Sequence, residues 1–208
     1  MSDDLAWALE NMSSQYRSLR PEAFKIIDQA KEQAVPRLLD VLRQYADAKR
    51  QEIAIDVLWG LFRRYGIRHP DLVSALVEAI ESNVDNSPLV VLDGIGLLAD
   101  LKDPSAFDDF VRFIQDKSHG NSDILREGAV EGLGLLADPR AIPYLVNTLN
   151  DELDLIRGRA FWALGRIAEQ NPSEVPLIID KLRENDSTEA YELLEKLDRN
   201  RNNNDLMG

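Results

Sequence analysis

A short motif recurs four times in this chain, and the recurrence constrains the fold more than any other feature. Each copy is an apolar stretch built around one small residue: Gly60, Gly94, Gly132 or Ala163. Successive small residues are 34, 38 and 31 positions apart. Repeats of this size predict stacked units, because one unit cannot bury its apolar face alone. We therefore expect an array of similar units.

Each copy of the motif is followed, a few residues later, by a polar residue and a proline. The four dipeptides are His69-Pro70, Asp103-Pro104, Asp138-Pro139 and Asn171-Pro172. An Asp or Asn side chain accepts hydrogen bonds from the free N–H groups of a helix start, and Pro suits the first helical position. The last three dipeptides therefore predict a helix start, and His69 is a weaker signal.

Each unit is predicted to contain two helices. In the fourth unit, apolar residues spaced three and four apart form one stripe from Ile142 to Leu149. Asn150–Glu152 is the predicted turn, and Leu153–Glu169 is the predicted second helix. The second helices also contain glycines, which cost about 1 kcal/mol in a helix interior. We expect these glycines, Gly132 among them, to allow close packing between stacked units.

Weaker helical pairs are predicted at both ends of the array. At the N-terminus they are Leu5–Ser13 and Pro21–Gln33, and at the C-terminus Val175–Leu182 and Ser187–Leu197. Asp186 and Glu189 have the spacing of reciprocal helix caps. The predicted organisation is a single array over residues 1–198, with an N-terminal cap at 1–33, four clear repeats at 34–173 and a C-terminal cap at 174–198. Residues 199–208 are predicted to be a disordered tail.

The sequences of the third and fourth units resemble a known repeat. Asp138–Leu145 followed by Arg157–Ile167 resembles a HEAT-like repeat of the phycobilisome-lyase type, and Leu125–Pro139 matches the pattern again. The resemblance implies an all-α fold, a right-handed α-solenoid (α-α superhelix) of about six HEAT-like helix pairs. It also implies first helices on the convex side and second helices on the concave side.

Proteins of this architecture fall into several functional classes. The resemblance favours a non-catalytic scaffold that binds a protein partner on its concave face. A bilin lyase subunit or phycobiliprotein chaperone is the alternative, and an enzyme of unknown type is a third class. Di-iron members of the family carry His-Glu dyads, but here Pro70 follows His69 and Gly120 follows His119. No cofactor or metal site is therefore predicted.

Composition narrows the range of partners. The net charge is -13 at pH 7, which disfavours nucleic acid and anionic membranes as partners. There is no Cys, so disulfides and thiolate chemistry are excluded. The acidic N-terminus does not resemble a secretory signal, and no apolar run approaches the roughly 20 residues of a membrane span. These features predict a cytoplasmic protein, and the resemblance implies a protein partner.

The second helices supply the candidate binding residues. Aligning the four motifs places Trp and Arg at each end of a concave ridge, with two carboxylates between them. The predicted ridge consists of Trp59, Arg63, Asp93, Glu131, Arg159, Trp162 and Arg166. Trp and Arg are the types enriched in binding hot spots. Two alternatives remain open: the Trp side chains are core residues with Arg stems beside them, or Asp93 and Glu131 are an acid/base pair.

Overall fold

The structure is a computed structural model, which describes residues 2–12, 20–44 and 47–205. Regular structure in this part of the chain is entirely helical. The α-helices are α1 (Ser2–Asn11), α2 (Arg20–Ala30), α3 (Val35–Leu42), α4 (Ala48–Tyr65), α5 (Leu72–Asn83), α6 (Pro88–Leu101), α7 (Phe107–Gln115), α8 (Ser122–Leu136), α9 (Ile142–Thr148), α10 (Asp154–Gln170), α11 (Val175–Arg183) and α12 (Thr188–Asp205). Short 3-10 turns precede four of them: η1 (Lys31–Ala34), η2 (Pro104–Ala106), η3 (Pro139–Ala141) and η4 (Pro172–Glu174).

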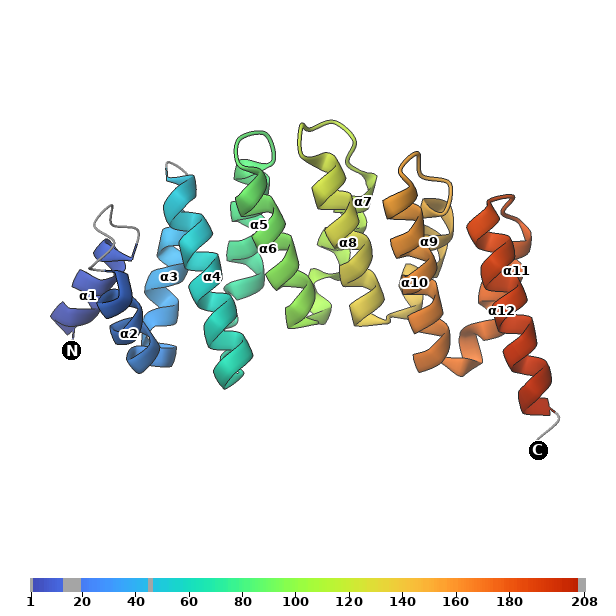
Figure 1. Ribbon diagram of the computed structural model, residues 1–208, viewed down its shortest axis with the longest axis horizontal. Coiled ribbons are helices and arrows are strands. Elements are labelled where there is room, and N and C mark those ends of the chain that lie inside the picture. The colour runs from blue at the N-terminus through green and yellow to red at the C-terminus, as the bar shows by residue number, and fades with distance from the viewer. Residues whose placement is uncertain (1, 13–19, 45–46, 206–208) are drawn as a thin grey trace. The chain divides into compact units, whose positions relative to one another are not determined.

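The chain divides into two compact units, each with the same internal arrangement. Unit 1 comprises residues 1–101 and 118–124, and unit 2 comprises residues 102–117 and 125–208. In unit 1, α3 packs on α4 and α5 on α6, while α3 also contacts α5 and α4 contacts α6 (Figure 1). In unit 2, α9, α10, α11 and α12 are related in the same way. Paired helices in two layers confirm the predicted all-α fold of the HEAT-repeat solenoid class.

The repeated Asp-Pro dipeptides begin helical turns as predicted. Asp103 accepts a hydrogen bond from the N–H of Ser105, and Asp138 accepts one from the N–H of Arg140. In both cases the proline occupies the first turn of a 3-10 segment that leads into the first helix of a pair. These contacts satisfy N–H groups that a helix start leaves without a partner in the chain.

Two predicted caps are wrong. Asn171-Pro172 does begin a helical turn, η4, as predicted, but the Asn171 side chain does not cap it. This side chain instead donates hydrogen bonds to the carbonyls of Ala137 at 2.9 Å and Ile167 at 3.1 Å. At α12 the capping residue is Ser187, whose hydroxyl accepts from the N–H of Ala190 at 3.2 Å. Asp186 is therefore not the cap, because α12 begins two residues after it.

Gly132 lies in a close contact, as predicted, but its neighbour is in its own helix pair. A Cβ atom built on Gly132 would overlap the ring of Phe110, which is on α7. Gly96 and Gly134 instead face a neighbouring pair. A Cβ on Gly96 would lie 2.8 Å from Cη2 of Trp59 on α4. Glycine thus serves both kinds of packing, within a pair and between pairs.

The predicted ends of the array differ from the observed helices. α1 ends at Asn11, and Ser13, the predicted end of the first helix, lies outside the described residues. α12 continues to Asp205, so the predicted tail at 199–208 begins inside a helix. Residues 206–208 lie outside the described ranges. The proposed division into caps and four clear repeats stays a prediction.

Candidate protein-binding surface

One stripe of α10 carries three of the predicted residues. Arg159, Trp162 and Arg166 follow Leu155 at intervals of four, three and four residues, which places all four on one side of the helix. Trp162 is 38% exposed and Leu155 is 58% exposed, although both are large hydrophobic side chains. We call these four residues the α10 stripe. It offers apolar area and guanidinium donors on one rigid helix.

Trp162 is held in place by α8, the second helix of the preceding pair. A Cβ on Gly134 of α8 would come within 2.7 Å of Cζ3 of the Trp162 indole, so the ring lies against a backbone without a side chain. The guanidinium of Arg166 lies 5.2 Å from the centre of the same ring. Arg166 also donates from Nε to the carbonyl of Gly134 at 3.1 Å. The indole is therefore held between Gly134 and Arg166, and Trp162 remains 38% exposed to solvent.

The charge of Arg159 is compensated within unit 2. Its guanidinium pairs with Glu127 at 3.0 Å and with Glu131 at 3.5 Å, both on α8. No ion pair of Arg166 occurs among the residues that the structure describes. Arg166 is thus the cation of the stripe whose charge is not balanced by a carboxylate within the described part of the chain.

The second Trp and Arg pair lies in unit 1 and is more strongly engaged. Trp59 is half-buried, and its indole N–H donates to Oδ2 of Asp100 at 2.8 Å. Arg63 stacks over the Trp59 ring at 4.6 Å and donates to the same oxygen at 2.7 Å. Trp59 also covers Gly96. This arrangement fits the alternative in which the Trp packs between neighbouring helices with an Arg beside it.

The two predicted carboxylates belong to different units. Asp93, on α6 in unit 1, is half-buried, and Glu131, on α8 in unit 2, is paired with Arg159. The pKa of Asp93 is raised, chiefly by burial and further by the negative charges of Asp56 and Glu52. Within the described residues, no group of three or more His, Cys, Asp or Glu could hold a metal ion.

Sequence reasoning missed the partners of the predicted arginines. Asp100 is 37 residues from Arg63, and Glu127 is 32 residues from Arg159. Arg157 and Glu189, also 32 residues apart, pair at 2.7 Å. Opposite charges separated by about one repeat length therefore pair across adjacent second helices. That spacing is visible in the sequence and would have identified both carboxylates. Leu155 was missed because the repeat alignment began at the motif and not at the helix start.

Comparison with known proteins supports the repeat assignment. Residues 118–197 match the family model for HEAT repeats. A search of curated proteins gives no match. In the described ranges, no helix combines the length and the apolar character that crossing a membrane requires. HEAT repeats commonly serve as scaffolds for protein interactions. The matched range, which runs from the turn before α8 to the middle of α12, supports a HEAT-like repeat protein.

Proposed function

We propose that this protein is a non-catalytic HEAT-like scaffold that binds a protein partner through the α10 stripe. The observation that carries the proposal is the partly exposed indole of Trp162, whose packed part lies against Gly134 with Arg166 over the ring. A large aromatic ring that is held in place and still partly exposed offers contact area at little cost in conformational entropy. Such aromatic and Arg anchors supply most of the binding free energy in protein interfaces.

The contacts also indicate which chemistry the partner presents. Leu155 and Trp162 call for an apolar counterpart, and Arg166 calls for a carboxylate or carbonyl acceptor. Arg159 contributes less, because Glu127 and Glu131 already occupy its guanidinium. We therefore expect one apolar anchor and one acceptor on the partner, instead of a broadly acidic patch.

The proposal is tested by measuring affinity for a partner purified from the source cell with the wild-type chain as bait. Trp162→Ala should weaken binding by about 2 kcal/mol or more, which is roughly 30-fold. Asp109→Ala is the control, because Asp109 lies on α7 and pairs with Arg112 at 2.6 Å, away from the stripe. Circular dichroism first establishes that each variant folds.

Three outcomes would contradict the proposal. If Trp162→Ala unfolds the chain, the indole is a core residue. If the folded variant binds as tightly as Asp109→Ala, the stripe is not the binding site. If co-expression with a phycobiliprotein and bilin yields an attached chromophore, the bilin lyase alternative replaces the scaffold. Arg166→Ala provides a second test of the stripe, because it removes the unbalanced cation and keeps the Trp162 side chain; circular dichroism again establishes that the variant folds, since Arg166 also contacts Gly134 and the indole.

A further inference from the structure

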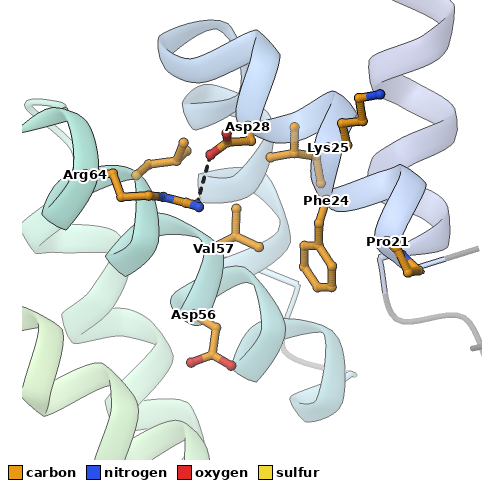
Figure 2. Close-up of a pocket in the computed structure, with 9 residues that line it drawn as sticks. Pro21, Phe24, Lys25, Asp28, Asp56, Val57 and Arg64 are labelled. Atoms are coloured by element: carbon orange, nitrogen blue, oxygen red, sulfur yellow. Dashed lines mark ion pairs between the residues drawn. The ribbon is translucent and has the colours of Figure 1, made fainter.

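Unit 1 contains a cleft between α2 and α4 that the α10 stripe does not involve. Its volume is 480 Å³, and its apolar lining includes Pro21, Phe24, Val57 and Leu61. Figure 2 shows the Phe24 ring directed toward α4, with Val57 beside it and Asp56 on the adjoining part of α4. Phe24 is 39% exposed. The cleft thus joins an apolar wall to a carboxylate.

Asp56 is the acidic group of the cleft that is not engaged by a cation. Asp28, the other carboxylate, pairs with Arg64 at 2.9 Å (Figure 2). It also accepts a hydrogen bond from the Tyr65 hydroxyl at 2.9 Å. The Lys25 side chain points away from Asp56. Over the described ranges no ion pair is formed by Asp56, and its side chain is accessible to solvent although its surroundings cover part of it.

Neighbouring carboxylates strengthen the negative field at Asp56. The pKa of Asp56 is raised, first by partial burial and then by the charge of Glu52, one helical turn earlier. Asp56 in turn raises the pKa of Asp93 on α6. Lys49 lowers the pKa of Asp56 and of Asp93. Its ammonium lies 2.6 Å from Glu52, however, so it compensates the Glu52 carboxylate first. An additional cation at Asp56 would therefore be stabilised.

We propose that this cleft receives a lysine side chain of a partner protein, with its methylene chain against Phe24 and Val57 and its ammonium on Asp56. The proposal rests on complementarity of shape and charge. Lysine has an apolar stem that ends in a cation, and it commonly buries the stem while the head reaches a polar group. The cleft presents these two environments in the same order.

The test uses two short acetylated and amidated peptides, one with a central lysine and one with norleucine, which has a similar stem without the charge. NMR titration follows the Phe24 ring protons and the Asp56 carboxyl carbon. The lysine peptide should bind wild-type protein about fivefold more tightly than the norleucine peptide, as expected for one exposed charge pair. It should also lower the pKa of Asp56, because a nearby cation favours the ionised carboxylate.

Variants separate the charge from the apolar wall. Asp56→Asn should remove the preference for lysine over norleucine, and Asp40→Asn, at an exposed position on α3, should leave it unchanged. Phe24→Ala should weaken both peptides alike. Equal binding of the two peptides by the wild type, or loss of preference in Asp40→Asn, would overturn the proposal. Trp162→Ala should have no effect here, so failure of this site and failure of the α10 stripe are distinguishable.

Discussion

Trp162 lies against Gly134 so closely that a methyl group on Gly134 would come within 2.7 Å of the indole and 2.8 Å of the Ala163 Cβ. The same relationship recurs in unit 1, where Trp59 covers Gly96. In each case the Trp side chain is on one second helix and the glycine is on the adjacent one. The absence of a Cβ therefore sets the depth at which each indole lies, and with it the area that Trp162 leaves exposed.

Gly134→Ala should destabilise the protein and displace Trp162. Alanine has the better helix propensity, but its Cβ would meet both the indole and the backbone of α10. We expect a loss of about 1–3 kcal/mol in the free energy of unfolding, the usual cost of overpacking. Gly158→Ala is the control, since a Cβ there meets nothing within 4 Å, and it should stabilise by up to about 1 kcal/mol. Urea unfolding measures both. Equal stability of the two variants would show that α8 and α10 are not in close contact at Trp162.

Gly132→Ala should also destabilise, because its Cβ would overlap the Phe110 ring. This outcome differs from that of an exposed helical glycine, where alanine is favourable. Shortening the opposing side chain should relieve the overlap. A double-mutant cycle with Phe110→Leu is therefore expected to show a coupling free energy of about 1 kcal/mol or more between the two positions. Additive effects would place Gly132 away from Phe110.

Asp151→Asn should be among the most destabilising single changes in unit 2. Asp151 forms an ion pair with Arg126, and both side chains are almost fully buried, at 7% and 6% exposure. Removing the carboxylate charge breaks this buried ion pair, which typically costs about 3–5 kcal/mol. Glu152→Gln, one residue further on and 88% exposed, should change stability by less than about 0.5 kcal/mol. Thermal unfolding at neutral pH measures the stability of the two variants, and equal stability would contradict this prediction.

Asp56→Asn should stabilise the protein at neutral pH. The Asp56 pKa is raised in the folded state, so ionisation of this carboxyl opposes folding. The expected gain is about 0.2–0.5 kcal/mol, the usual cost of two like charges one helical turn apart. Below the unfolded pKa of about 3.9 the gain vanishes, because Asp56 is then protonated in both states. As pH rises through the raised pKa the gain reaches its full value. A stability difference that is independent of pH between 3 and 7 would rule out this electrostatic origin.

The repeating part of the fold could be predicted well from the sequence, because the signals that define the repeat depend on residues close together in the chain. Asp103-Pro104 and Asp138-Pro139 begin turns through contacts within two residues, so they depend on nothing remote. Asn171 has the same local pattern, yet its side chain donates a hydrogen bond to the carbonyl of Ala137, 34 residues away. At α12 the helix begins at Thr188, so Ser187 and not Asp186 lies at the cap position.

The binding residues were harder to predict because their roles depend on neighbours one repeat away. Periodicity placed Trp162, Arg159 and Arg166 on one side of a helix. It did not indicate that Glu127 and Glu131 engage Arg159, or that Gly134 limits how far Trp162 is buried. The cleft beside Asp56 was missed entirely, since α2 lies in a segment without a clear repeat motif.

The internal pairing of Arg159 has a consequence for how the α10 stripe responds to ionic strength. Salt weakens association mainly by screening charges that are exposed before the partners meet. Glu127 and Glu131 already neutralise Arg159, so Arg166 is the cation that screening would affect. Partner binding through Leu155 and Trp162 should therefore persist at salt concentrations that dissociate a charge-driven complex.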